Sequence, residues 1–235
     1  MTTTGAEASA IGAGWRESKW LAGVELAAVL ALFAADLRHL VPFSKTPFLV
    51  ALGWISLRLR ACGWRSVGFA KPRSWGRALA AGALAGAGME LLELLGTHPW
   101  LSRLLHKPPD LSSFRPAVGN LRIALVLLVL VWVLAAFGEE LAYRGYLMNR
   151  VAGLAGPGKR SPAAWLLSLV MISALFGAGH IHQGLTGQLE NVIDGLLLGL
   201  LYLACGRNLA APILAHGLQD TIDLLLIFLG KYPGL

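Results

Sequence analysis

The stretch Arg122–Met148, RIALVLLVLVWVLAAFGEELAYRGYLM, joins a long apolar run to two adjacent carboxylates and an arginine. The run is long enough to cross a bilayer as a helix, which takes roughly 17 to 25 residues. An ionisable side chain in such a helix costs about 2.5–3.5 kcal/mol at the bilayer centre, so Glu139, Glu140 and Arg144 need partners or a wet cavity. The stretch therefore predicts a membrane-spanning helix that carries a polar site.

The whole chain has the composition of a membrane protein. Of its 235 residues, 56% are hydrophobic and 14% are charged, whereas soluble domains carry roughly 25% charged residues. We predict an all-α fold, a polytopic membrane helix bundle with about seven transmembrane helices. Besides Arg122–Met148, the apolar runs lie near Trp20–Ala35, Pro47–Ile55, Ala78–Leu95, Pro162–Gly179, Val192–Cys205 and Leu209–Leu229.

The predicted domain organisation is simple. Residues 1–19 form a polar N-terminal tail, and residues 20–235 form a single membrane domain, because the connections between apolar runs are too short for a soluble domain. Glycines recur at helix-packing spacing in Gly82–Gly86 and Gly195–Gly199, which predicts close approach of helix backbones.

The positive charge of the chain is better explained by membrane orientation than by nucleic-acid binding. The net charge is +7, but the basic residues fall between the apolar runs rather than on one polar face. With the N-terminus inside and seven spans, twelve of the 20 Lys and Arg residues lie on the cytoplasmic side, seven lie outside, and Arg144 lies within a helix. We expect a multi-pass protein of the plasma membrane, in contact with lipid, with its site facing the cytoplasm and with no nucleic-acid partner.

The carboxylates near the end of Arg122–Met148 divide into two roles. Glu140 and Arg144 are four residues apart and can pair across one helical turn, whereas Glu139 lies about 100° further round the helix. Glu139 is therefore free to face something else. The alternative is a buried structural ion pair with a spare carboxylate.

Two later segments place further polar residues on apolar helices. Phe176 and His180 are four residues apart in FGAGH, and His216 and Asp220 repeat that spacing in HGLQD. Each pair lies on one helical face. Polar groups in hydrocarbon tend to converge on one another or on water, so we expect the three segments to meet.

These motifs resemble a known family. EELAYR (Glu139 to Arg144), FGAGH (Phe176 to His180) and HGLQD (His216 to Asp220) are similar, in order, to the EExxxR, FxxxH and HxxxN-type motifs of the CAAX prenyl protease and bacteriocin-processing (CPBP) family of intramembrane proteases. The resemblance covers residues 121–230, a CPBP-like catalytic core. It implies that Glu139 is the general base, that Glu140, Arg144 and Phe176 are supporting residues, and that His180, His216 and residue 220 bind or polarise water and stabilise the oxyanion.

Asp220 departs from the asparagine often found in this family, which leaves the use of a metal open. Asn can donate a hydrogen bond to an oxyanion, whereas ionised Asp cannot, so Asp220 would instead orient His216 or help to hold a cation. A zinc ion could be bound by Glu139, His180, His216 and Asp220 only if the three segments meet. We favour the metal-free account, because this set lacks the compact spacing that usually fixes a catalytic zinc.

One estimate opposes the expected convergence. At 1.5 Å per residue, Glu139 lies roughly 16 Å from Arg150, which we take as the cytoplasmic end of its helix, whereas His180 lies roughly 30 Å from Arg160.

Other polar residues have simpler interpretations. We expect His182 to be a loop residue, Glu90 and Glu93 to face a loop or a neighbouring helix, and Asn191 and Asp194 to be candidates for the cavity lining.

The predicted function is hydrolysis of a peptide bond by an intramembrane endopeptidase with a glutamate-activated water. Following the resemblance, the substrate would be a peptide or a prenylated protein processed at a CaaX-type C-terminus. Two alternatives remain. One is a non-catalytic role in bacteriocin self-immunity or as a membrane scaffold, and the other is a proton-coupled transporter, because intramembrane carboxylates and histidines also mark ion pathways.

Overall fold

The computed structural model describes residues 18–155 and 161–235, and this part of the chain forms helices and loops without a β-strand. The predicted all-α fold is confirmed, whereas most of the predicted polar tail lies outside the described residues. The α-helices are α2 (Lys19–Leu37), α3 (Thr46–Leu59), α4 (Trp75–Leu92), α5 (His98–Leu104), α6 (Leu121–Leu130), α7 (Met148–Ala155), α8 (Pro162–Ala178), α9 (Gly184–Ala204) and α10 (Ala210–Phe228). The other helical segments are η2 (Trp64–Val67), η3 (Glu93–Thr97), η4 (Ser112–Ala117), η5 (Val131–Leu147) and η6 (Ile181–Gln183).

Each predicted apolar run is helical, but fewer helices meet the length of a membrane span. Within the described residues, four continuous helical stretches are long and apolar enough to cross a membrane: Lys19–Leu37, Trp75–Leu104, Leu121–Ala155 and Ala210–Phe228. A fifth is added if Pro162–Ala178 and Ile181–Ala204, which are bent by 60°, count as one broken span, and α3 is a shorter apolar helix. The predicted number of about seven spans is therefore approximate.

The long stretch Leu121–Ala155 carries the EELAYR motif through the middle of the bundle. It begins as α6, capped by the Asn120 side chain, which accepts a hydrogen bond from the backbone N–H of Ile123. It then widens into η5, a π-type helix that packs against α3, α7 and α10. Widened helical segments are frequent at functional sites. Every residue from Glu140 to Leu147 is buried, so the motif faces protein rather than lipid.

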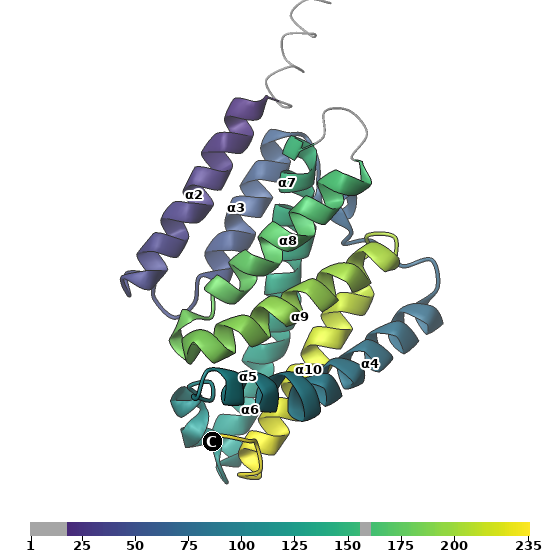
Figure 1. Ribbon diagram of the computed structural model, residues 1–235. Coiled ribbons are helices and arrows are strands. Elements are labelled where there is room, and N and C mark those ends of the chain that lie inside the picture. The colour runs from purple at the N-terminus through teal and green to yellow at the C-terminus, as the bar shows by residue number, and fades with distance from the viewer. Residues whose placement is uncertain (1–17, 156–160) are drawn as a thin grey trace, which may run out of the picture.

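The glycine pairs bring helices close together, as predicted. A Cβ atom added at Gly86 would lie 2.5 Å from the carbonyl oxygen of Ala215, and one at Gly195 would lie 2.9 Å from the Cα of Ser173. These contacts let α4 pack along α10 and let α8 pack along α9 (Figure 1). Because α10 carries HGLQD and the junction of α8 with α9 carries FGAGH, this packing sets the positions of both motifs.

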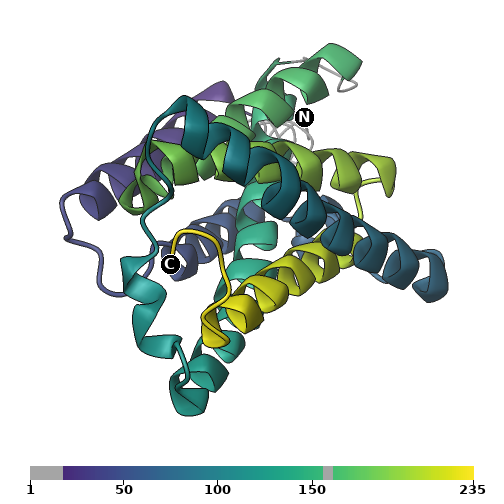
Figure 2. The ribbon, with the colours of Figure 1, turned by 60° about the horizontal axis from the view of Figure 1, so that its bottom comes forward.

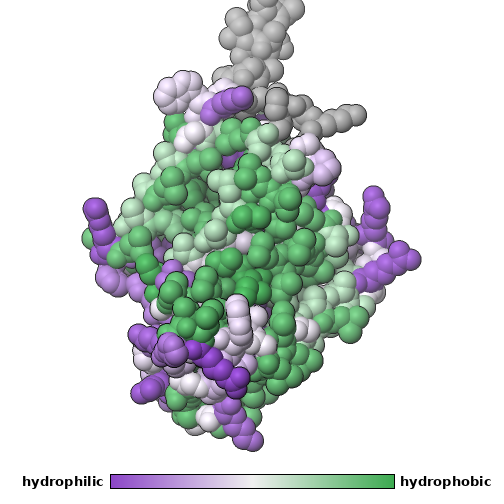
Figure 3. Space-filling view, viewed as in Figure 1, coloured by the Kyte–Doolittle hydropathy of each residue, from purple (hydrophilic) through white to green (hydrophobic). Residues whose placement is uncertain are grey.

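The surface and the C-terminus fit a protein embedded in lipid. The face seen in Figure 3 is largely hydrophobic, with hydrophilic side chains gathered at its margins. Trp20, Phe43, Leu84 and Leu95 are all more than three-quarters exposed, as lipid-facing side chains would be. After α10 the C-terminal segment turns back toward the middle of the molecule (Figure 2), where Tyr232 is buried against Glu93.

Candidate active site

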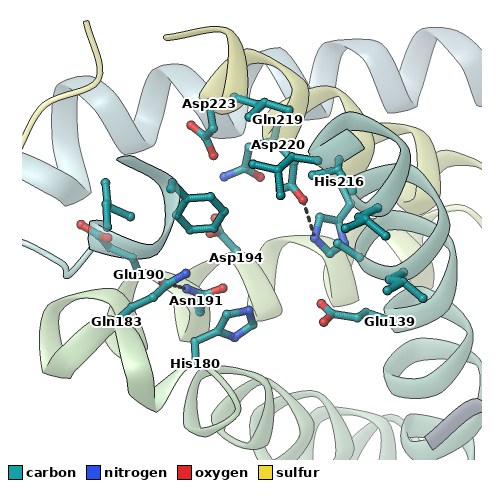
Figure 4. A pocket seen from close by; sticks show the side chains of 18 of the residues that line it. Glu139, His180, Gln183, Glu190, Asn191, Asp194, His216, Gln219, Asp220 and Asp223 are labelled. Atoms are coloured by element: carbon teal, nitrogen blue, oxygen red, sulfur yellow. Dashed lines mark hydrogen bonds and ion pairs between the residues drawn. The ribbon is translucent and has the colours of Figure 1, made fainter. Parts of the chain in front are cut away.

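The three motifs open onto one cavity inside the helix bundle. Glu139 on η5, Phe176 and His180 at the end of α8, and His216 and Asp220 on α10 all line a cavity of about 340 Å³. Figure 4 shows Glu139, His180 and His216 around the same space. Glu140 and Arg144 do not line it. The structure thus brings together all four residues with a predicted catalytic role. Of the three predicted supporting residues, Phe176 also lines the cavity, and Glu140 and Arg144 lie behind it.

Glu139 is the carboxylate that faces the cavity. It is half-buried, and its Oε1 accepts a hydrogen bond of 3.2 Å from the hydroxyl of Thr46, the first residue of α3. Thr46 also lines the cavity. Arg144 pairs with the neighbouring carboxylate of Glu140 rather than with Glu139.

Glu140 and Arg144 form a buried pair behind the cavity. The Glu140 side chain is fully buried and Arg144 is 1% exposed, and Nη1 of Arg144 donates to Oε1 of Glu140 at 2.6 Å. Nη2 of Arg144 donates to the backbone oxygen of Gly195 on α9 at 3.1 Å. The pair predicted from the sequence is therefore present, and it also ties η5 to α9.

Glu140 has a second partner that the sequence did not indicate. Nδ1 of His216 lies 3.0 Å from Oε1 of Glu140, and an ionised carboxylate can only accept, so Nδ1 carries the proton. Nε2 of His216 lies 3.6 Å from Oδ2 of Asp220, an ion-pair distance too long for a hydrogen bond (Figure 4). The side chain that orients the His216 ring is therefore Glu140, while Asp220 adds a negative charge on the cavity side.

His180 lies where the chain bends between α8 and α9. Its Nδ1 is 2.9 Å from the backbone oxygen of Phe176, which again assigns the proton to Nδ1 because a carbonyl oxygen accepts. The Nε2 atom is then left for a ligand or water in the cavity. Lys45, a residue outside the three motifs, stabilises this bend, because its Nζ donates to the backbone oxygen of Gly179 at 2.8 Å.

The depth estimate that opposed convergence was wrong because Arg150 does not mark a helix end. The helix continues to Ala155, and Arg150 is paired within the bundle with Glu25 of α2 at 3.0 Å. Counted from Ala155 and from Pro162, Glu139 and His180 lie at similar depths, about 24 Å and about 27 Å at 1.5 Å per residue.

Phe176 packs against the polar residues from all three segments. Its ring centroid lies 5.0 Å from that of Tyr143, 4.9 Å from that of His180 and 6.0 Å from that of His216. The guanidinium carbon of Arg144 lies 4.6 Å from the same ring. Phe176, which is 2% exposed, therefore fixes the spacing between the two histidines and the buried ion pair.

Several cavity residues escaped prediction. Ser44 lies in a loop and Thr46 begins α3, and neither element carries a motif. Glu93, Gln183 and Glu190 lie outside the three quoted motifs. The two candidates Asn191 and Asp194 do line the cavity, whereas His182 does not and instead stacks on His39 with centroids 5.2 Å apart. The available signal was the i,i+3 repeat of acidic residues in Glu90–Glu93 and Asp220–Asp223, each on an apolar helix.

The predicted zinc ligands do not form a compact set of donors. Within the described residues, the acidic and histidine side chains whose donor atoms lie within 4.8 Å of one another in a group of three are Glu90, Glu93 and Asp223. Glu139, His180, His216 and Asp220 do not form such a group. As placed, these four residues do not fit a tetrahedral zinc ion.

Fold and site together define a class of protein, an integral membrane protein of several helices with a polar, cavity-lining site inside the bundle. Residues 121–222 match the family model described as type II CAAX prenyl endopeptidase Rce1-like. Searches of curated proteins and of solved structures gave no match. The family match confirms the resemblance that the three motifs predict.

Proposed function

We propose that this protein is an intramembrane endopeptidase in which Glu139 activates a water molecule to hydrolyse a peptide bond. The observation that carries the proposal is the convergence of Glu139, His180, His216 and Asp220 on one cavity from three separate segments. The family match over residues 121–222 supports it independently.

The proposed reaction uses side chains of this chain alone. The free oxygen of Glu139 accepts a proton from water, and the resulting hydroxide attacks the scissile carbonyl carbon, which gives a tetrahedral oxyanion. His216, between Glu140 and Asp220, stabilises the oxyanion as a cationic imidazole, since a protonated ring can donate at Nε2 while Nδ1 donates to Glu140. Glu139 then returns the proton to the leaving amine as the C–N bond breaks. His180 holds the water or substrate through Nε2.

The composition of the cavity lining supports a substrate with an apolar part. Besides the polar residues, the lining includes aliphatic side chains of α6, η5 and α10, namely Leu127, Leu130, Val131, Leu134, Leu224 and Ile227. Such side chains suit an isoprenoid chain or the aliphatic residues of a CaaX-type C-terminus. We infer a prenylated protein or peptide as the substrate, reached from the cytoplasmic side of the plasma membrane.

The test compares cleavage of a quenched farnesylated CaaX peptide by purified wild-type protein and by Glu139→Gln. The amide oxygen introduced by this substitution can still accept from Thr46, so the fold should persist while turnover falls by about 10²–10⁴-fold, the contribution typical of a general base. Equal cleavage by the two proteins would reject Glu139 as the base. Wild-type protein without cleavage of any prenylated peptide would favour the immunity or scaffold role instead.

The transporter alternative rests on the number of acidic groups in the cavity. Beyond the motif residues, the lining includes Glu93, Glu190, Asp194 and Asp223. Proton flux in proteoliposomes distinguishes the two functions. A flux that persists in Glu139→Gln while peptide cleavage is undetectable in both proteins would support transport.

A further inference from the structure

Three carboxylates face one another where α4 packs against α10. Glu90 is near the end of α4, Glu93 begins η3, and Asp223 lies on α10, and their oxygens lie within 4.8 Å of one another. From the sequence, Glu90 and Glu93 were expected to face a loop or a neighbouring helix. The neighbouring helix is α10, and Glu93 and Asp223 also line the cavity (Figure 4 labels Asp223).

The charge of this cluster is not balanced by basic groups of the protein. None of the ion pairs among the described residues includes Glu90, Glu93 or Asp223. Glu90 is 2% exposed, and neither of its carboxyl oxygens has a hydrogen-bond donor from an amide, a hydroxyl or a basic group. Oδ1 of Asp223 also has none. An uncompensated buried carboxylate costs several kcal/mol, so something must neutralise it.

Glu93 is held in place by two neutral donors. Nε2 of Gln219 donates to its Oε2 at 2.7 Å, and the Tyr232 hydroxyl donates to its Oε1 at 2.6 Å. The amide of Gln219 and the phenol of Tyr232 are both uncharged donors. The two donors orient Glu93 toward Glu90 and Asp223 without supplying a positive charge.

We propose that Glu90, Glu93 and Asp223 bind a hard divalent cation of the Ca²⁺ type. All three donors are carboxylate oxygens, the ligands that Ca²⁺, Mg²⁺ and Mn²⁺ prefer, and no sulfur or imidazole joins them. Because Glu93 and Asp223 line the cavity, an ion can enter from it and complete its coordination with water. The flexible geometry of Ca²⁺ suits a group of side chains on two different helices better than the strict octahedron of Mg²⁺.

The ion would fasten α4 to α10 at the level of the candidate active site. Asp223 lies three residues beyond Asp220 on the same helix, and Gln219 next to Asp220 contacts Glu93 directly. The site is separate from Glu139 and its proposed chemistry. Failure of the cation proposal would therefore not refute the protease proposal, and failure of the protease proposal would not refute the cation proposal.

The test uses purified full-length protein in detergent after removal of metal with a chelator, with Mn²⁺ as the probe. Electron paramagnetic resonance measures the concentration of free Mn²⁺, and competition with Ca²⁺ measures which of the two ions the site prefers. Elemental analysis of the protein before chelation detects an ion that the chelator does not remove. We expect one saturable site per chain, displaced by Ca²⁺, and a rise in thermal unfolding temperature on adding Ca²⁺. Glu90→Gln and Asp223→Asn should each weaken binding by at least about tenfold, the effect of about 1.4 kcal/mol.

Two control variants locate the ion. Glu190→Gln alters a carboxylate of the same cavity that pairs with His98 at 3.2 Å, and Glu139→Gln alters the candidate catalytic base. Both should bind Mn²⁺ like the wild type. Weaker Mn²⁺ binding by Glu139→Gln would place the ion at the candidate active site instead. If Glu190→Gln weakened Mn²⁺ binding as much as Glu90→Gln does, the binding would reflect the overall acidity of the cavity rather than the three carboxylates.

The proposal is overturned if wild-type protein binds no Mn²⁺ or Ca²⁺ and contains neither before chelation. In that case a proton rather than a cation neutralises the buried Glu90, and Glu90→Gln should be at least as thermostable as the wild type. If Glu90→Gln does not fold, the Mn²⁺ binding and the thermostability of Asp223→Asn are compared with those of the wild type, and the same outcomes apply.

Discussion

Glu139 and Glu140 are neighbours in sequence with opposite surroundings. Glu139 is half-buried at the cavity and accepts one hydrogen bond from a hydroxyl, whereas Glu140 is fully buried between a guanidinium group and an imidazole. A general base needs access to water, and a carboxylate that fixes other side chains needs exclusion of water. The surroundings of the two residues therefore fit the proposed division of roles, with Glu139 as the base and Glu140 as the partner of Arg144.

Removing one partner of the buried pair should lower stability. Glu140→Ala or Arg144→Ala leaves the other charge buried and uncompensated, which costs roughly 3–5 kcal/mol. Thermal unfolding followed by circular dichroism in detergent should show a lower midpoint, together with a lower yield. The double variant Glu140→Met, Arg144→Met should lose less stability than either alanine variant. Unchanged midpoints in the single variants would contradict the structural role of the pair.

Asp220 tests the use of a metal at the candidate active site. Its Oδ2 lies beyond hydrogen-bond distance of His216, and Glu140 already orients the ring, so Asp220→Asn should keep activity within about tenfold of wild type. If Asp220 is a metal ligand, loss of its charge should instead collapse activity. The measurement pairs peptide cleavage with elemental analysis. Near-stoichiometric zinc, with activity lost to a chelator and restored by zinc, would contradict the metal-free account.

At the scale of elements, the connection between α2 and α3 reaches into the site although it lies outside the family-matched residues. Lys45 donates to the backbone beside His180, and Thr46 donates to Glu139. Lys45 is itself held by Asp36 at the end of α2, at 3.2 Å. Two adjacent residues thus set the relative positions of the base on η5 and the histidine at the α8–α9 bend.

Thr46→Val should therefore lower kcat without unfolding the protein. The substitution keeps the shape of the side chain and removes the hydroxyl, and one hydrogen bond of about 1 kcal/mol corresponds to a roughly fivefold change in rate. Cleavage of the farnesylated peptide and the unfolding midpoint are measured together. Thr46→Ser, which keeps the hydroxyl, should retain activity, and an equal loss in both variants would show that packing rather than the hydrogen bond matters.

The contact between α4 and α10 offers a matched pair of glycines. Gly86 faces the backbone of Ala215, whereas a Cβ atom at Gly88 in the same helix would have nothing within 4 Å. Gly86→Ala should destabilise the protein by about 1–3 kcal/mol through overpacking. Gly88→Ala should be neutral or slightly stabilising, because alanine favours the helix. The unfolding midpoints of the two variants decide, and equal midpoints would contradict close packing at Gly86.

At the scale of the whole molecule, contacts between distant loops limit the possible topology. The backbone N–H of Leu209 donates to the oxygen of Gly68 at 3.0 Å, so the loops after α3 and after α9 lie on the same side of the membrane. Glu25 pairs with both Arg60 and Arg150, which places the end of α3 beside α7. These are the loops that the distribution of basic residues assigns to the cytoplasm.

Labelling of the exposed Cys62 tests this orientation. In a Cys205→Ser variant, a membrane-impermeant maleimide should modify Cys62 in inverted vesicles and not in intact cells. The second cysteine follows α9 and is predicted on the same side, so Cys62→Ser should give the same pattern more slowly, because Cys205 is half-buried. Labelling of Cys62 from outside intact cells would reverse the assigned topology.

The sequence by itself determined the properties that depend on local order along the chain. Apolar runs predicted the helices, the i,i+4 spacing predicted the Glu140–Arg144 pair, and the glycine pairs predicted close helix contacts. The three motifs also predicted the resemblance to the family whose model matches residues 121–222, because each motif is contiguous in the sequence.

Only the tertiary structure decided which distant residues meet. Glu140 and His216, which are in contact, lie 76 residues apart in the sequence. Thr46 contacts Glu139 across 93 residues, and Gln219 contacts Glu93 across 126 residues. No local spacing predicts such contacts, because they depend on how the helices pack and on where the chain bends between α8 and α9. For the same reason, the sequence alone could not show that Glu90, Glu93 and Asp223 form one acidic cluster, since they meet only where α4 packs against α10.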